Sequence, residues 1–177
     1  MDAEELLNRY AAGERNFRDV DLFRAELSNA NLSGASLFRA NLFRANLFRA
    51  NLLGSNLFQA TLIGADLYCA NLSAANLSGA NFSGASLKGV DFSGADLNGA
   101  DLSGAILSHA NLSYTDLSRT EFFRADLEGA NLAGASLMGA NLKGANLTGV
   151  TVTDARLSQA IGLSEETKEE LMLQGAI

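Results

Sequence analysis

The amino-acid sequence predicts an all-β solenoid, because one apolar residue recurs at every fifth position over most of the chain. The series of these central residues begins with Phe17 and Leu22 and ends with Val152 and Leu157. On a helix with 3.6 residues per turn, each step of five advances about 140° around the axis, so no apolar stripe forms. On a flat strand, alternate central residues would point to opposite faces. A chain that turns a corner every five residues, always in the same sense, would direct all of them to a common axis.

A small side chain stands two positions before each central residue, and it is usually alanine. The residue after it is commonly Asn, Asp, Ser or Thr, so the repeat reads A-(N/D)-L-x-x. Past Arg15, which precedes Phe17, the departures from alanine are Val20, Ser55, Val90, Thr115, Thr120 and Val150. A second inward side chain on each face must share a narrow, closely packed interior with the central residue, which explains why this position holds small residues.

A solenoid leaves an unpaired strand edge at each end, and the flanking sequences are predicted to cover these edges. A chain of 177 residues fits one structural unit. We expect it to have three parts: an N-terminal helical cap over residues 1–14, the solenoid over residues 15–160, and a C-terminal helical cap over residues 161–177.

Capping residues and apolar side chains indicate one short helix in each flank. Asp2 is the predicted N-cap of the first helix, and Glu5 is placed to complete a capping box with it. Ser164 is the predicted N-cap of the second helix. On this second helix, Leu171 and Met172 are expected to pack on the last coil.

The chain is acidic, with 20 Asp and Glu residues, 13 Lys and Arg residues and a net charge of −7. This balance disfavours direct binding to nucleic acid, in which Lys and Arg displace counterions from phosphates, and it favours basic partners. The single cysteine, Cys69, excludes an intramolecular disulfide and fits a reducing compartment. The acidic N-terminal segment is unlike a signal peptide, and no run reaches roughly 18 apolar residues. We therefore expect a cytoplasmic protein without a membrane span.

The runs ANLFRANLFR and ADLNGADLSG resemble the pentapeptide-repeat family, and the resemblance extends over residues 15–160 without a gap. It implies a right-handed quadrilateral β-helix with four pentapeptides per coil and about seven coils. Well-understood members of this family confer quinolone resistance by binding DNA gyrase, which they do by resembling duplex DNA in shape and charge.

Two positions follow each central residue and point outward, and in the first three coils they combine aromatic residues with arginine. Large exposed apolar patches usually mark interaction surfaces, and arginine beside aromatic residues is typical of interface hot spots. The alternative is that the phenylalanines only shield the backbone and stabilise it by stacking. The candidate interaction surface consists of Phe23, Arg24, Phe38, Arg39, Phe43, Arg44, Phe48, Arg49, Phe58 and Tyr68.

Acidic residues gather instead in the fourth to sixth coils. With a step of 20 residues, Asp96 is expected near Asp116, and Asp101 near Glu121. Such a patch could imitate DNA phosphates or attract a basic partner; the alternative is a solvated face in which Asp replaces Asn. The candidate acidic patch consists of Asp91, Asp96, Asp101, Asp116, Glu121 and Asp126.

We expect no catalytic residue, cofactor or metal ion, because a convex rod offers no concave site that excludes water. Cys69 and His109 are predicted on the same outward position two coils apart, about 10 Å from each other, which is too far to share a metal. The predicted function is a non-catalytic scaffold that binds a protein partner or associates with itself through its outer surface. The alternative is a DNA mimic that binds a type II topoisomerase such as DNA gyrase.

Overall fold

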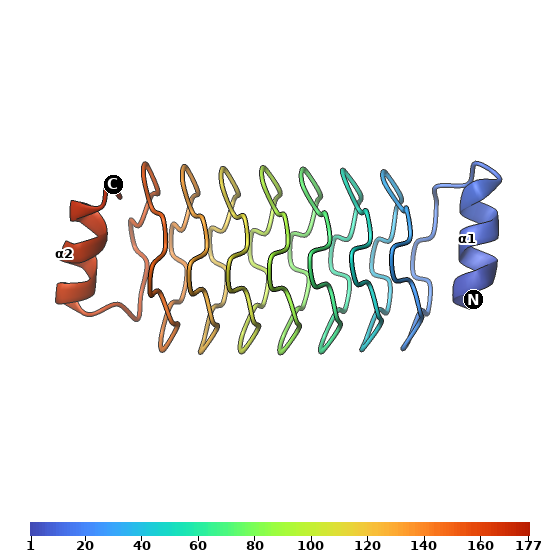
Figure 1. Cartoon of the computed structure of the whole chain (residues 1–177), viewed down its shortest axis with the longest axis horizontal. Helices are drawn as coiled ribbons and strands as arrows, with labels where there is room; N and C mark the ends of the chain where they lie inside the picture. The colour runs from blue at the N-terminus through green and yellow to red at the C-terminus, as the bar shows by residue number, and fades with distance from the viewer.

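The computed structural model describes all of residues 1–177 and shows a rod of stacked coils with one helix at each end (Figure 1). Helix α1 spans Ala3–Ala11, and helix α2 spans Glu165–Leu173. The chain between them advances steadily along the long axis, so each coil contacts only the coils before and after it. Neither helix has the length and apolar character needed to cross a membrane.

Each coil takes 20 residues, because the parallel bridges join every bridged residue to the one 20 positions later. The first bridge joins Asn16 to Ser36, and the last joins Asn141 to Ile161. Four pentapeptides therefore complete one coil. The contacts are single-residue bridges rather than extended strands, since a turn follows each one immediately. The predicted all-β class is thus realised without regular strands.

The central residues form a continuous column inside the rod. Of the 29 positions from 17 to 157 in steps of five, all are buried except Leu147 and Leu157, which are partly exposed in the last coil. The hydroxyl groups among the small inward residues are also satisfied: Ser55 Oγ donates to the Leu52 carbonyl at 2.7 Å, and Thr120 Oγ1 donates to the Leu97 carbonyl at 2.9 Å. The interior therefore accepts these departures from alanine without an unpaired polar atom.

Each corner is a four-residue turn that begins at the central residue. After Leu22, for example, the Ala25 N–H donates to the Leu22 carbonyl at 3.0 Å, and Arg24 has a φ of 53°. The third turn residue is in the left-handed region throughout the solenoid, which glycine adopts freely and other residues adopt only with strain. The side chain of the Asn or Asp before the central residue often braces the turn, as where Asn41 Oδ1 accepts the Phe43 N–H at 3.1 Å.

Helix α1 closes the N-terminal end of the core. Asp2 caps it as predicted, since its side chain accepts the Glu5 N–H at 2.8 Å. The reciprocal bond of a capping box is absent, because Glu5 turns along the helix toward Arg9, 3.4 Å away. Leu6 is fully buried, and the Tyr10 hydroxyl donates to the Ser33 carbonyl at 2.8 Å. One apolar anchor and one hydrogen bond thus attach α1 to the first coil.

Helix α2 covers the other end less completely. Ser164 caps it as predicted, with its Oγ accepting the Thr167 N–H at 3.1 Å. Leu171 is buried, but the expectation for Met172 is wrong, because this side chain is 58% exposed. Met172 follows Leu171 directly and so points about 100° away from it around the helix. After α2, residues 175–177 pair with the last coil, where the Leu157 N–H donates to the Ile177 carbonyl at 2.9 Å.

The turn geometry predicts opposite effects for two substitutions at equivalent corners. Ala74 has a φ of 54°, so Ala74→Gly should relieve strain and raise the free energy of unfolding by about 1 kcal/mol. Gly84 has a φ of 64°, and no atom lies within 4 Å of the place that a Cβ would take. Gly84→Ala should therefore lower the free energy of unfolding by about 1 kcal/mol through backbone strain alone. Urea unfolding of both variants measures the effects. Changes of the same sign in both would contradict this account of the corners.

Candidate interaction surface

The ten predicted aromatic and arginine residues lie on three successive corners of the first coils, and we refer to them together as the Phe/Arg surface. Their backbone positions are set by the turns, since each aromatic residue is the second turn residue and each arginine is the third. The fourth corner carries no aromatic side chain and has Ser33, Leu53 and Ser73 at the corresponding positions. The surface therefore wraps most of the circumference near the N-terminal end.

The aromatic rings form three ladders between neighbouring coils. Phe23 stacks on Phe43 with centroids 5.8 Å apart, Phe38 on Phe58 at 5.6 Å, and Phe48 on Tyr68 at 5.7 Å. The planes in each pair lie within 10° of parallel. The 20-residue step brings these rings together, as the sequence predicts. Stacking of this kind stabilises adjacent coils.

Each arginine of the surface lies against the ring that precedes it. The Cζ atom of Arg44 is 5.3 Å from the centroid of the Phe43 ring, and that of Arg49 is 5.1 Å from the Phe48 ring. These distances fit cation–π contacts. The arginine side chains are nevertheless exposed. Arg39 Nε pairs with Asp19 Oδ1 at 3.2 Å, whereas Arg24, Arg44 and Arg49 make no ion pair and keep their donors free for a partner.

Stacking between the aromatic rings buries only part of the Phe/Arg surface. Phe23, at the end of its ladder, is 51% exposed, whereas the other aromatic residues of the surface are half-buried. Exposed aromatic ring edges and arginine guanidinium groups therefore alternate around the rod. Such a surface can bind another protein through apolar contact and through bidentate hydrogen bonds to carboxylates.

Sequence reasoning missed two further contributions of the same kind. Arg18 lies over the Phe38 ring, with its Cζ atom 4.3 Å from the centroid, and so extends that ladder by one coil. Phe123 and Arg124 repeat the Phe-Arg corner near the C-terminal end, where Phe123 is 38% exposed. The sequence signal for the second pair is the run FFRA at residues 122–125. It is isolated, since no aromatic side chain stacks on Phe123.

The candidate acidic residues do not form one continuous patch. Asp96 is bridged to Asp116 on one face of the rod, and Asp101 is bridged to Glu121 on the next face. Asp126 follows one face later, bridged to Ile106 and Asn146, and Asp91 lies on the remaining face between Asn71 and Asn111. Four of the six carboxylates are therefore brought together on two adjacent faces, and the other two lie apart from them.

Most of these carboxylates also brace the turns. Asp91, Asp96, Asp101 and Asp116 each accept the backbone N–H two residues later at 2.9 Å. Glu121, whose side chain is one methylene longer, makes no such bond and instead accepts from Asn141 Nδ2 at 2.7 Å. The Asx bond accounts for the interchange of Asn and Asp at this position, because either side chain supplies the accepting oxygen.

Asp101 is the residue of the candidate acidic patch whose pKa is shifted. Partial burial works to raise the pKa of its carboxyl, but hydrogen bonds from the side chain and backbone of Ser103 and from the Ser83 hydroxyl together outweigh burial and lower it. The Ser83 Oγ lies 2.8 Å from Asp101 Oδ2. Asp101 thus stays ionised while both of its oxygens are engaged by the rod itself.

The remaining reactive side chains are dispersed. Cys69 is exposed as a free thiol, and its Sγ lies over Gly89 in the next coil. His109 lies over Gly129 in the same way. The structure contains no group of three His, Cys, Asp or Glu side chains placed to hold a metal ion.

Fold and surface together define a repeat solenoid whose variable side chains all lie on a convex exterior. The family model described as pentapeptide repeats matches eight copies over residues 16–54, 40–79, 55–94, 85–122 and 120–159. The chain belongs to the pentapeptide-repeat family, as the A-(N/D)-L-x-x repeat predicts. Proteins of this family are generally non-enzymatic.

Two solved structures illustrate the relationship. HetL, a pentapeptide repeat protein involved in heterocyst differentiation regulation from the cyanobacterium Nostoc sp. strain PCC 7120, is 34% identical over 92% of this chain and 93% of HetL, with a TM-score of 0.49. Trypsin-treated QnrB1, a plasmid-mediated fluoroquinolone resistance protein, is 20% identical over 93% of both chains, with a TM-score of 0.64. The likeness to QnrB1 concerns the fold alone. No curated protein matches the sequence.

The hydrogen bonds to Asp101 predict a measurable pH dependence. Because its folded-state pKa is below the ordinary value of 3.8, its carboxylate stabilises the fold above that pH, and this contribution is lost as pH falls through the lowered value. Asp101→Asn should therefore be less stable than the parent protein at neutral pH and lose less stability in acid. Urea unfolding at about pH 7 and about pH 2 measures the difference.

Asp154→Asn is the matched control for this measurement, because the Asp154 side chain is exposed and makes no hydrogen bond in the structure. We expect this control to follow the parent protein. Indistinguishable pH dependence in Asp101→Asn and Asp154→Asn would show that the bonds from Ser83 and Ser103 do not stabilise the fold.

Proposed function

We propose that this protein is a non-catalytic scaffold that binds a protein partner through the Phe/Arg surface. The observation that carries the proposal is the presence of three aromatic ladders, each flanked by arginine, on successive corners of the same coils. Ladders that served only to stabilise the rod would be expected along its whole length. Instead, the outward positions from residue 73 to residue 104 are occupied mainly by Ser and Gly.

Backbone strain is concentrated in the first three coils, which contain the Phe/Arg surface, and recurs at residues 109–124, 154 and 159. From residue 79 to residue 104, the third turn residue is always glycine, which adopts the left-handed conformation without strain. In the first three coils most of these positions are held by larger residues, including Arg24, Arg39, Arg44 and Arg49. Each costs about 1–2 kcal/mol that glycine would not. Contacts between each arginine and the adjacent ring offset part of this cost. Stability alone does not explain the remaining strain, which is expected where a side chain has a role in binding.

The charge of these coils selects the kind of partner. Residues 15–64 contain six arginines and three acidic residues, a net charge of +3, within a chain whose total is −7. The preference of the whole chain for basic partners therefore does not apply to this surface. In a symmetric dimer, a second copy would bring an equally cationic surface against it. The partner that fits best is a different protein with carboxylates beside apolar residues.

A second candidate function is supported by the four carboxylates of Asp96, Asp116, Asp101 and Glu121 on two adjacent faces. They give the middle of the rod an acidic strip, and the resemblance to the pentapeptide-repeat family implies a DNA mimic that binds a type II topoisomerase. The strip is short, because Arg119 lies at the corner between these two faces. Asp96 and Asp101 also use carboxylate oxygens to accept bonds from Ser78 and Ser83. We therefore rank this function below the scaffold.

The Phe/Arg surface can be tested without disturbing the fold. Arg44 has a φ of 54°, and glycine holds the same position in many other corners, so Arg44→Gly should fold normally while removing one guanidinium group. We expect this variant to bind a partner captured from the native host about tenfold more weakly, as is typical of an arginine hot spot. The measurement is quantitative affinity capture followed by titration of the purified partner.

Arg119→Gly provides the matched control, because Arg119 has a φ of 58° at an equivalent corner outside the Phe/Arg surface. It should retain the affinity of the parent protein. Equal binding by both variants would exclude the Phe/Arg surface as the interface. A size in sedimentation analysis that increases with concentration, and that Arg44→Gly abolishes, would identify self-association as the function instead.

The topoisomerase alternative is tested by DNA gyrase supercoiling assays. Because the acidic strip is short and the first coils are cationic, we expect no inhibition by micromolar protein. Inhibition that Asp96→Asn and Asp116→Asn together remove would establish the acidic strip as the functional surface and overturn the ranking above.

A further inference from the structure

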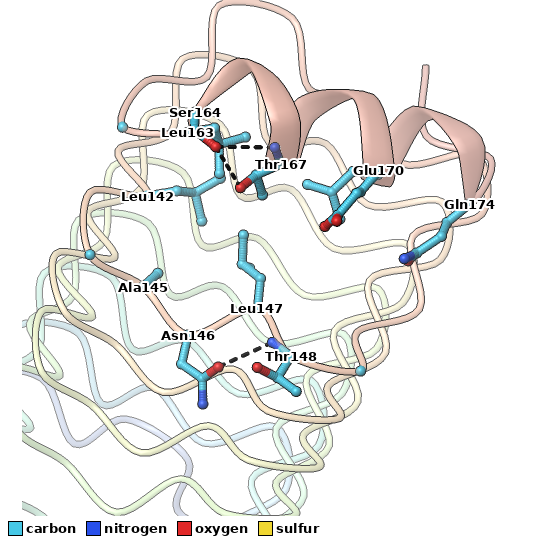
Figure 2. Close-up of a pocket in the computed structure, with 14 residues that line it drawn as sticks. Leu142, Ala145, Asn146, Leu147, Thr148, Leu163, Ser164, Thr167, Glu170 and Gln174 are labelled. Atoms are coloured by element: carbon cyan, nitrogen blue, oxygen red, sulfur yellow. Dashed lines mark hydrogen bonds between the residues drawn. The ribbon is translucent and has the colours of Figure 1, made fainter.

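A groove of about 680 Å³ separates helix α2 from the last coil, and nothing in the proposed function uses it (Figure 2). Its floor is formed by the side of the coil that contains Ala145, Asn146 and Leu147, and its wall is formed by one side of α2. The lining residues are Leu142, Gly144, Ala145, Asn146, Leu147, Thr148, Gly149, Gly162, Leu163, Ser164, Thr167, Glu170, Leu171 and Gln174.

The floor of the groove is an unpaired strand edge. One coil earlier on the same face, the Leu127 N–H donates to the Asn146 carbonyl at 2.9 Å, and the Gly129 N–H donates to the Thr148 carbonyl at 2.8 Å. The corresponding N–H groups of Gly144, Leu147 and Gly149 have no backbone partner. Because α2 crosses this edge as a helix, it cannot continue the parallel ladder.

Paired residues of the last coil bound the unpaired stretch on both sides. At one side of it, the Leu142 N–H donates to the Ile161 carbonyl at 2.9 Å. At the other side, the Asp154 N–H donates to the Gly175 carbonyl at 2.8 Å. Between them, the ladder N–H groups of Gly144, Leu147, Gly149 and Val152 have no backbone partner, and this stretch is long enough for one five-residue segment on the face of Leu147.

The groove also exposes part of the apolar core. Leu147 is a central residue, yet it is only partly buried, whereas the central residues of complete coils are inaccessible. Figure 2 shows its side chain pointing from the coil toward α2, with Leu163 near the start of the helix. Leu171 forms the apolar part of the helical wall. An apolar side chain placed on Leu147 would complete the column as a leucine of a further coil would.

The rim gives the groove an acidic character. Glu170 lies on the side of α2 that lines the groove, together with Gln174 (Figure 2). Helix α2 contains four glutamates and one lysine, and this lysine, Lys168, is paired with Glu165 at 2.7 Å. A ligand that carries a cation beside its apolar side chain would therefore be favoured.

We propose that this groove binds an extended peptide segment of a partner protein, with a leucine-like side chain flanked by Arg or Lys, which adds to the rod as a parallel strand. The ladder sets its register: one peptide residue donates its N–H to the Ala145 carbonyl and accepts the Leu147 N–H. The side chain of the next peptide residue packs on Leu147, and a neighbouring cation faces Glu170. Main-chain bonds supply affinity, and the two side chains supply specificity.

A second copy of the chain does not offer such a segment. The Leu-Phe-Arg run at residues 22–24 lies in the first coil beside the start of α1, and the runs at residues 37–49 are already paired on both sides. Within residues 43–50, the Asn46 N–H donates to the Ala25 carbonyl at 2.9 Å, and the Leu47 N–H donates to the Asp66 carbonyl at 2.7 Å. A free peptide with the same sequence would have these groups available.

The test uses a synthetic peptide with the sequence of residues 43–50, FRANLFRA, acetylated and amidated, which copies the same face of an earlier coil. Titrated into the full-length protein labelled with nitrogen-15, it should shift the amide resonances of Gly144, Leu147 and Gly149 and slow their hydrogen exchange. The peptide FRANDFRA, which places a carboxylate at the apolar position, should bind at least roughly tenfold more weakly.

Two glutamate variants distinguish peptide binding in the groove from general electrostatic attraction of the peptide to the acidic helix α2. Glu170→Lys should weaken FRANLFRA binding about fivefold, because it replaces an attractive contact with a repulsive one. Glu166→Lys makes the same charge change at an exposed position of α2 that does not line the groove, and it should have less than roughly a twofold effect.

The proposal is overturned if saturating peptide leaves the three amides unshifted, or if the two lysine variants weaken binding equally. Protection of the same amides by raised protein concentration without peptide would assign the groove to a second copy instead. Because Arg44→Gly does not alter the groove, its effect on partner capture and the peptide titration report on the two surfaces separately.

Discussion

The parallel bridge between residues 20 positions apart is the interaction on which the rest of the structure depends. It is made by the backbone, so it recurs regardless of which side chains occupy the two outward positions of each pentapeptide. The column of central residues keeps the coils aligned, since a slip of one residue would place a polar side chain in a dry interior. Surface and fold are thereby separated: the chain can vary its exterior at almost every corner without changing its backbone.

This separation explains which features could be predicted from the sequence. The burial of Leu77 and the bridge between Asp96 and Asp116 both follow from periodicity, because every coil imposes the same environment. Periodicity does not predict the burial of residues in the last coil, which has no further coil stacked on it. Leu147 has the same sequence context as Leu77, yet its exposure depends on how α2 docks, and the docking depends on few contacts. The groove was therefore beyond sequence reasoning, and only the position of Leu147 in the last coil pointed toward it.

The residues of the Phe/Arg surface and the stacking of its rings were predictable from the sequence, but not every contact was. The 20-residue step placed Phe38 on Phe58, whereas the contact of Arg18 with the same ladder depends on the side-chain direction of a residue in the first coil. The role of the Asn and Asp residues before the central residue was not apparent from their spacing. In the turns, a short side-chain oxygen accepts a backbone N–H, which the longer Glu121 side chain does not do.

The two ends of the rod solve the problem of the open strand edge differently, and this difference determines what the molecule can present. At the N-terminal end, Leu6 and the Tyr10 hydroxyl fasten α1 onto the first coil, and the Phe/Arg surface begins directly beside it. At the C-terminal end, residues 175–177 pair with part of the last coil, and the ladder N–H groups from Gly144 to Val152 have no backbone partner. Phe48 and Leu147 are about five coils apart, or roughly 25 Å at the usual spacing between strands. Since no insertion interrupts the coils, the rod maintains this separation rigidly, so ligands bound at the two surfaces would be held at a distance set by the number of repeats between them.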